Sequence, residues 1–253
     1  MKILIIRHGE PDYTIDSLTE KGWREADYLA EMLERKLCGA AQGGGADGQV
    51  HFYMSPYGRA QDTAAATLKK LGRTADVLPW LREFDVLIDR PDDLTRKRVS
   101  WDWPPADWMQ DPRLYLADHW FENERMAASN VGEEYRKVTE AFDELLAKHG
   151  YVREGGYYRA ERSNHDTLVF FCHFGLEGVL LSHLLGVSPM PVWQGFCARP
   201  SSVTTVVTEE RREGIAAFRI LAFGEVTHLY VHDEEPSFAA RFCECFSDDT
   251  RHD

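Results

Sequence analysis

The stretch KILIIRHGE, residues 2–10, joins an apolar run directly to an arginine and a histidine. KILII (2–6) has the composition of a short strand that is buried on both faces of a sheet. Arg7 and His8 follow at its carboxyl end, and both side chains are costly to remove from water. Gly9 lets the backbone turn tightly after His8. The stretch therefore predicts a strand that ends at a cavity for an anion.

The rest of the chain alternates predicted strands with predicted helices. Strands are expected at 50–54, 75–79 and 167–172, with a hairpin of 202–208 and 215–223, and helices at 18–37, 55–72, 133–148 and 176–185. Thr19 and Ser55 are the expected N-caps of the first two helices, Pro56 fits the first turn of the second, and Gly72 ends it. The alternation predicts an α/β fold, a three-layer α/β/α sandwich with a mostly parallel central sheet.

Residues 80–130 interrupt this pattern. They contain five of the seven tryptophans and several prolines, which is typical of an irregular, partly helical segment. At 253 residues the chain suits a single domain over 1–253, with this segment inserted as a cap. We expect the cap to lie over the ligand pocket and to set specificity. Its tryptophans could line a substrate cleft or bury the cap against the sheet edge.

The charge balance restricts the possible partners. The chain has 29 basic and 42 acidic residues, a net charge of −13. A field of this sign disfavours binding to nucleic acid and to anionic membranes. The expected partner is a small ligand that a local basic cluster attracts, and no coiled-coil pattern indicates an oligomer.

The cysteines and the apolar runs indicate a cytoplasmic protein. The five cysteines are an odd number without the spacing of a disulfide framework, as expected for reduced thiols. The apolar run at the N-terminus is too short for a signal peptide, and no run reaches the length of a membrane span. Cys243 and Cys245 could bind a metal, but no second Cys/His pair stands nearby to complete four ligands. We interpret this pair as inert.

Polar residues follow three predicted strands at their carboxyl ends. They are Arg7 and His8 after 2–6, Arg59 one helical turn after 50–54, and His173 after 167–172. In an open α/β sheet these ends meet at one edge, where ligands gather. Arginine side chains match phosphate oxygens, and the N-termini of the following helices favour anions. The sequence therefore predicts a phosphate pocket.

Histidine has a specific use in such a pocket. A neutral imidazole attacks phosphorus near neutral pH when a hydrogen bond holds its other nitrogen. The surrounding cations offset the charge on the phosphoryl oxygens during transfer. A proton must also reach the leaving oxygen, and LREFD (81–85) supplies Glu83, with Asp85 as a second candidate. The pattern predicts phosphoryl transfer through a histidine.

These residues resemble known motifs. Arg7-His8-Gly9-Glu10 resembles the signature of the histidine phosphatase superfamily, the phosphoglycerate-mutase-like enzymes. Further segments resemble motifs of that family in the same order: LTEKGWREA (18–26), SPYGRAQDTA (55–64), LREFD (81–85), HFG (173–175) and GEVTHL (224–229). Glu25 and Asp62 stand where the family usually has glutamine. Residues 86–130 lie outside the resemblance.

The resemblance implies a role for each motif residue. His8 would be the nucleophile that becomes phosphorylated. Arg7, Arg59, His173 and the backbone N–H of Phe174 would hold the phosphoryl oxygens. Glu83 would protonate the leaving group and then activate the water that attacks phosphohistidine, which needs a raised carboxyl pKa. The chemistry implied requires no metal and no cofactor.

The family contains both phosphatases and mutases. Mutases continue the signature as RHG-x-S-x-W-N, whereas this chain has Pro11, Tyr13 and Thr14 at those positions. Thr14 replaces an asparagine that usually touches the phosphoryl group, and it is a candidate phosphate ligand here. We expect a histidine acid phosphatase-like, metal-independent phosphomonoester hydrolase for a small phosphorylated metabolite. The alternatives are a phosphoglycerate-type phosphomutase and a non-catalytic phospholigand-binding protein.

Overall fold

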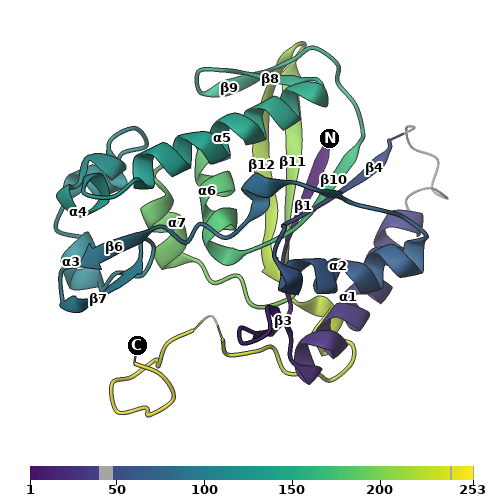
Figure 1. The fold of residues 1–253 in the computed structure, drawn as a ribbon. Helices are drawn as coiled ribbons and strands as arrows, with labels where there is room; N and C mark the ends of the chain where they lie inside the picture. The colour runs from purple at the N-terminus through teal and green to yellow at the C-terminus, as the bar shows by residue number, and fades with distance from the viewer. Residues whose placement is uncertain (40–47, 240, 253) are drawn as a thin grey trace.

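The computed structural model describes residues 1–39, 48–239 and 241–252, and an eight-stranded sheet lies at its centre (Figure 1). The strand order is β5-β4-β10-β1-β11-β12-β9-β8. The strands are β1 Lys2–Arg7, β4 Val50–Met54, β5 Asp76–Val77, β8 Tyr151–Glu154, β9 Tyr157–Ala160, β10 Thr167–Cys172, β11 Val203–Arg212 and β12 Ile215–Glu225. The half from β5 to β1 is parallel, and the pairings from β1 to β8 are antiparallel.

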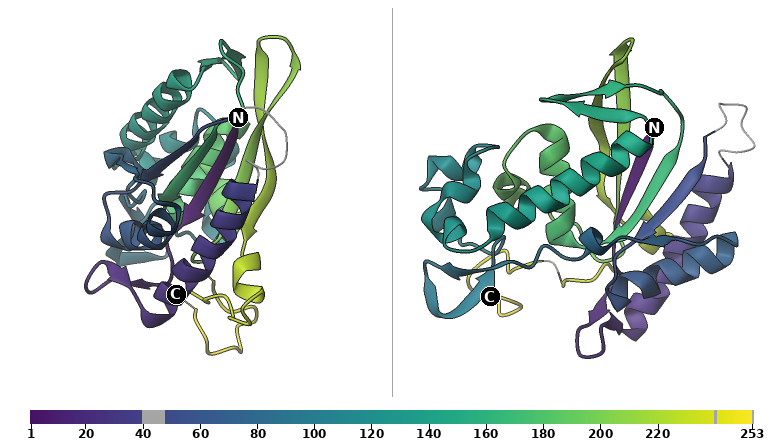
Figure 2. Two further views of the ribbon diagram at one scale, coloured as in Figure 1. Left: turned by 90° about the vertical axis from the view of Figure 1, so that its right-hand side faces the viewer. Right: turned by 45° about the horizontal axis from the view of Figure 1, so that its top comes forward.

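Helices cover both faces of this sheet, so the molecule has three layers (Figure 2). One face carries α1 Glu20–Gly39, α2 Gly58–Leu71 and the short α8 Thr227–Tyr230. The other carries α5 Val131–Lys148, α6 Phe174–Leu185 and α7 Pro189–Gly195. The predicted α/β/α sandwich is confirmed, and the predicted parallel strands lie side by side in it.

The apolar run at the N-terminus forms the central strand because both of its faces are buried. Ile3 and Ile5 pack with α5 and α6, while Leu4 and Ile6 pack with α1 and α2. All four side chains are fully buried, and each contributes roughly 1.5–3 kcal/mol through burial. This packing fixes the position at which β1 ends.

The helix termini follow the expected capping in part. The hydroxyl of Thr19 accepts a hydrogen bond from the N–H of Gly22 at 3.0 Å, as predicted for an N-cap. Gly72 ends α2 in the left-handed conformation, at φ +61°. The prediction for Ser55 and Pro56 is wrong, because α2 begins only at Gly58 and Tyr57 precedes it without a side-chain cap. The Ser55 hydroxyl accepts the N–H of Tyr57 at 3.2 Å, ahead of the helix, and is also bonded to a histidine of the site described below.

The segment 80–130 folds as a cap of short elements on α5 and α7. They are 3₁₀ turns at Pro79–Leu81, Pro112–Tyr115 and Trp120–Glu122, β6 Leu87–Arg90, β7 Asp93–Val99, α3 Pro105–Trp108 and α4 Glu124–Ala127. Trp120 is fully buried and packs edge-on against Tyr135 of α5 and Trp193 of α7. Most of the tryptophans of this segment are buried: Trp103, Trp108 and Trp120.

Two short strands, β2 Pro11–Asp12 and β3 Ser17–Leu18, form a hairpin after β1. The turn of this hairpin, between Asp12 and Ser17, lies beside the start of α2. There the carboxylate of Asp16 accepts a hydrogen bond from the backbone N–H of Gly58. Among the described residues, no helix has the length and apolar character needed to cross a membrane.

Candidate active site

Arg7 and His8 lie at the carboxyl end of β1, as predicted. The two residues are 6% and 1% exposed. Nη1 of Arg7 donates to the carbonyl oxygen of Ala198 at 2.7 Å, and the guanidinium lies 5.7 Å from the centre of the Phe174 ring. The backbone N–H of His8 donates to the carbonyl of Cys172 at 3.0 Å. The end of β1 is thereby tied to the end of β10.

The imidazole of His8 is held in one tautomer. Nδ1 lies 2.7 Å from the carbonyl oxygen of Gly9. A carbonyl oxygen only accepts, so Nδ1 carries the hydrogen and Nε2 keeps its lone pair. Burial, with the charge of Arg7 as the next cause, holds the pKa of His8 well below its ordinary value. The ring is therefore neutral at neutral pH, with Nε2 in the form of a nucleophile.

His173 lies beside His8, with 5.2 Å between the ring centres and an angle of 57°. Its Nε2 is 2.7 Å from the hydroxyl of Ser55. Burial and the nearby positive charges hold the pKa of His173 well below its ordinary value. Its Nδ1 is buried and has no hydrogen-bond partner within the part of the chain that the structure describes.

The guanidinium of Arg59 is braced from three sides. Its central carbon lies 5.4 Å from the ring centre of Tyr13 and 4.8 Å from that of Tyr57. Nη1 forms an ion pair of 2.5 Å with Oδ1 of Asp16. Oδ2 of Asp16 accepts a hydrogen bond from the N–H of Gly58 at 2.7 Å, so the same carboxylate holds both Arg59 and the start of α2.

Glu83 lies against the N-terminus of α6. Its Oε1 accepts hydrogen bonds from the backbone N–H groups of Phe84 at 2.8 Å and Leu176 at 3.0 Å. A Cβ on Gly175 would lie only 2.7 Å from this oxygen, so glycine is required there. Burial raises the pKa of Glu83, although the two N–H groups and Arg7 oppose the shift. A carboxyl that holds its proton more tightly suits a general acid.

Asp85 and Thr14 differ from Glu83 in their surroundings. The carboxylate of Asp85 is about half exposed and interacts with Arg82 and the hydroxyl of Tyr57. Thr14 lies on an exposed loop, and its hydroxyl donates to Oδ1 of Asp12 at 2.6 Å. Glu83, in contrast, lies at the N-terminus of α6 and within reach of the charge of Arg7, and is therefore the stronger candidate for the proton donor.

The sequence missed several residues that support the site. They are Tyr13, Asp16, Ser55, Tyr57 and Thr63. The hydroxyl of Thr63 accepts from the N–H of Gly9 at 2.9 Å and donates to the carbonyl of Arg59 at 2.7 Å, so it links the motif at 7–10 to the motif at 55–64. One signal was available for Ser55, because it directly follows β4 at the sheet edge where Arg7, His8 and His173 were expected.

A cavity of about 1160 Å³ opens beside this group, and its walls include Arg7 and Phe174. Residues of the cap form a large part of its lining, including Arg90, Trp101 and Trp103. The cap therefore lies over this cavity, and its place over the phosphate pocket itself stays a prediction. The indole of Trp101 packs edge-on against Phe174, with 5.5 Å between ring centres. Some tryptophans of the cap, such as Trp120, are therefore buried in the core, and others, such as Trp101, form part of the cavity wall.

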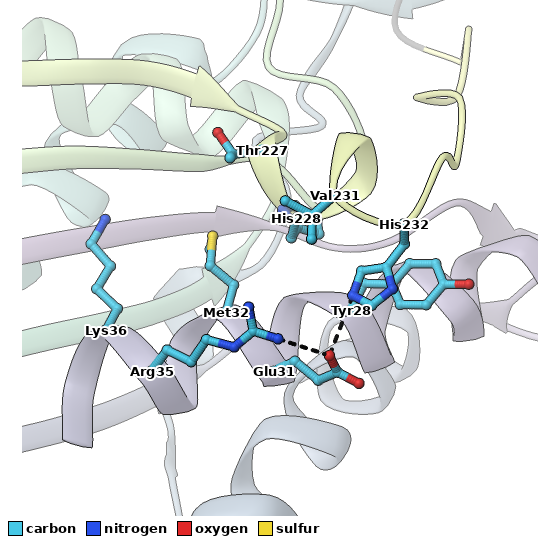
Figure 3. A pocket seen from close by; sticks show the side chains of 9 residues that line it. All are labelled: Tyr28, Glu31, Met32, Arg35, Lys36, Thr227, His228, Val231 and His232. Atoms are coloured by element: carbon cyan, nitrogen blue, oxygen red, sulfur yellow. Dashed lines mark hydrogen bonds and ion pairs between the residues drawn. The ribbon is translucent and has the colours of Figure 1, made fainter. Parts of the chain in front are cut away.

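A second cavity, of about 360 Å³, lies between α1 and α8 (Figure 3). The ring of His232 stacks on Tyr28 with 4.0 Å between centres, and Glu31 pairs with both His232 and Arg35. Its lining includes none of Arg7, His8, Arg59 and His173. The larger cavity is lined by Arg7 and by none of His8, Arg59 and His173, so the candidate active site lies beside it, at the carboxyl ends of β1, β4 and β10.

Solved structures with this fold support the assignment of the architecture. A phosphoserine phosphatase mutant from Entamoeba histolytica in complex with phosphoserine is 16% identical, with a TM-score of 0.54 over 90% of this chain and 98% of that chain. A mycobacterial glucosyl-3-phosphoglycerate phosphatase complexed with VO3 is 20% identical, with a TM-score of 0.52 over 88% and 98%. The alpha-ribazole phosphatase from Shigella flexneri is 18% identical, with a TM-score of 0.50 over 89% and 97%.

Comparison with curated protein sequences gives no match. The family model of the histidine phosphatase superfamily (branch 1) matches residues 3–220. This range includes the ends of β1, β4 and β10, where Arg7, His8, Ser55 and His173 converge. The match covers most of the chain and all of the candidate site, and the protein therefore belongs to the histidine phosphatase superfamily.

Proposed function

We propose that the protein is a phosphomonoester hydrolase that works through a phosphohistidine at His8 without a metal ion. One observation carries the proposal: the hydrogen bond from Nδ1 of His8 to Gly9 leaves the lone pair on Nε2, next to the ring of His173. The buried guanidinium of Arg7 and the braced guanidinium of Arg59 supply two fixed positive charges. Such charges stabilise a phosphoryl group most strongly where water is excluded.

In the first step, Nε2 of His8 attacks phosphorus and the bond from phosphorus to the ester oxygen breaks. Glu83, with its raised pKa, gives its proton to that oxygen. In the second step, the Glu83 carboxylate takes a proton from water, and the resulting hydroxide attacks the phosphohistidine. Inorganic phosphate then leaves, and both His8 and Glu83 return to their starting forms.

The proposed substrate is a small phosphorylated metabolite with an apolar or aromatic body. The cavity of about 1160 Å³ is somewhat larger than the usual range of roughly 300–1,000 Å³ for small-molecule sites. Trp101, Phe174 and Phe196 offer flat apolar surfaces in its wall. The names of the structural neighbours, phosphatases for phosphoserine, glucosyl-3-phosphoglycerate and alpha-ribazole, support a small phosphorylated metabolite in general. The net charge of −13 supports such a partner over nucleic acid or an anionic membrane.

The test is hydrolysis of p-nitrophenyl phosphate in excess chelator. His8→Ala is expected to lower kcat by about a thousandfold or more, as loss of a covalent nucleophile does. Wild type quenched in alkali during turnover should carry phosphate on His8. His119→Ala, which removes an exposed histidine of the cap, should leave kcat unchanged.

Other outcomes separate the alternatives. Activity that survives in His8→Ala, or that requires added metal, contradicts the proposed chemistry. Interconversion of phosphoglycerates with little release of phosphate indicates a mutase. Stoichiometric binding of phosphate esters in calorimetry without turnover indicates a binding protein.

A further inference from the structure

Three side chains with metal-ligating atoms meet outside the active site. His51 is the second residue of β4, His149 caps the C-terminal end of α5, and Asp166 immediately precedes β10. One ligand atom from each lies within 4.8 Å of the other two. Figure 1 shows the end of α5 and the starts of β4 and β10 on the same side of the molecule, near the N-terminus. His51 precedes Ser55 by four residues, about 13 Å along a strand, so this cluster is separate from the phosphate pocket.

The three atoms face one another without forming hydrogen bonds. Oδ2 of Asp166 lies 3.8 Å from Nε2 of His51 and 3.7 Å from Nδ1 of His149. Both distances exceed those of a hydrogen bond. A Zn²⁺ ion bound at 2.0–2.2 Å holds its tetrahedral ligand atoms roughly 3.3 Å apart. A small inward movement of the three side chains therefore gives the spacing of a zinc site.

The outer atoms of the cluster already have partners that orient it. Oδ1 of Asp166 accepts the N–H of Gln49 at 2.9 Å, which leaves Oδ2 directed at the two imidazoles. Nε2 of His149 lies 2.9 Å from the hydroxyl of Tyr53. If Nδ1 of His149 binds a metal, Nε2 carries the hydrogen and donates to Tyr53. Metal-binding histidines are usually held in this way.

The two imidazoles differ in exposure. His149 is 8% exposed. The side chain of His51 is 31% exposed, so water can reach the cluster from that side and fill a fourth ligand position.

We propose that His51, His149 and Asp166 bind one divalent transition-metal ion, and that this ion is Zn²⁺. Two imidazoles and one carboxylate with an open position form a donor set that zinc accepts. The ion would join the end of α5 to the starts of β4 and β10, a role in stability that is independent of phosphatase turnover.

The test is calorimetric titration of the metal-stripped full-length protein with Zn²⁺. The wild type is expected to bind one equivalent more than His51→Ala or Asp166→Asn. The difference between variants is the relevant quantity, because Sγ of Cys243 lies 3.4 Å from Nδ1 of His252 and that pair could also take zinc. Tyr53→Phe should keep the site and weaken it by about 10–100-fold. His165→Ala removes an exposed histidine next to Asp166 and should bind as the wild type does.

A second measurement uses Co²⁺ as a spectroscopic probe. The wild type should show visible absorption bands of imidazole-bound Co²⁺ that His51→Ala lacks, and Zn²⁺ should raise the Tm of the wild type more than that of the variant. Circular dichroism must first show that His51→Ala is folded. Equal stoichiometry in wild type, His51→Ala and Asp166→Asn overturns the proposal, as does failure of the wild type to bind Zn²⁺. Turnover of p-nitrophenyl phosphate in chelator is expected to be the same in His51→Ala and wild type.

Discussion

The hydroxyl of Ser55 lies 2.7 Å from Nε2 of His173 and joins the end of β4 to the start of α6. Both side chains are fully buried. His173 packs between His8 and Tyr57, with ring centres 5.2 Å and 5.3 Å away. The hydrogen bond therefore fixes how His173 faces the proposed phosphoryl site, and Ser55 acts as a positioning residue.

Ser55→Ala removes this hydrogen bond without adding volume. We expect kcat for p-nitrophenyl phosphate to fall by about 10–100-fold, because a histidine that holds the phosphoryl group loses its orientation. The pH dependence of kcat should also change, since His173 loses the partner of its Nε2. Ser182→Ala is the matched control: it removes a buried hydroxyl in α6 that donates to the carbonyl of Val179. A similar loss in both variants would assign the effect to packing.

Asp16→Asn keeps the shape of the side chain but removes the charge opposite Arg59. Asp16 has a φ of +49°, a conformation that asparagine tolerates well, so the backbone should be preserved. We expect kcat/KM to fall by about tenfold, because the guanidinium loses the ion pair that directs it. Asp12→Asn, on the same hairpin, should have little effect in the same steady-state assay. Equal losses would show that the hairpin conformation, rather than the partner of Arg59, controls activity.

The sequence was sufficient to predict where four site residues lie, because the strands before them can be recognised from their composition. These residues are Arg7, His8, Arg59 and His173. The apolar runs 2–6 and 167–172 have the composition of strands buried on both faces, as in a parallel sheet, and 50–54 follows the same pattern in part. The carboxyl ends of such strands meet at one edge, so the residues that follow them meet too. The convergence of these four residues depended on topology and needed no knowledge of side-chain contacts.

Other parts could not be predicted, for physical reasons that differ. The strand Asp93–Val99, DLTRKRV, is mostly exposed and pairs only with β6, so it lacks the apolar alternation of a half-buried strand. Ser55 before Pro56 has the pattern of a helix N-cap, and only the tertiary structure shows that its hydroxyl is used by His173. Asp16 is paired with Arg59, 43 residues further along the sequence. No local sequence pattern predicts such a long-range contact.

Hydrolysis rates of substrates with different leaving groups can show whether Glu83 or Asp85 is the proton donor. Glu83→Gln should lower kcat for an alkyl phosphate by about 100–10,000-fold, the range for loss of a general acid. The loss should be much smaller for p-nitrophenyl phosphate, whose phenolate leaves without a proton. Asp85→Asn should leave both rates near wild type, because this carboxylate is half exposed and paired with Arg82. If Asp85→Asn shows the leaving-group dependence instead, the roles are reversed.

The buried carboxyl of Glu25 makes stability depend on pH. Its Oε2 accepts the N–H of Glu10 at 2.8 Å, yet burial raises its pKa to about 7 from an ordinary value of 4.5. Between these two pH values the folded protein holds a proton that the unfolded chain has released. The free energy of unfolding therefore falls as pH rises from about 4.5 to 7 and then levels off.

Glu25→Gln keeps an oxygen for the N–H of Glu10 and removes the ionisable group. At pH 8 the variant should be more stable than wild type by about 2 kcal/mol, since each unit of pKa difference corresponds to about 1.4 kcal/mol and part of the shift relaxes. At pH 4 the two proteins should be nearly equal. Glu20→Gln, at an exposed position in the first turn of α1, should instead be slightly destabilising, because an acid there interacts favourably with the helix dipole. Urea unfolding of the three proteins at pH 4 and pH 8 measures these differences, and an advantage of Glu25→Gln that is equal at both pH values would contradict a buried, titrating Glu25.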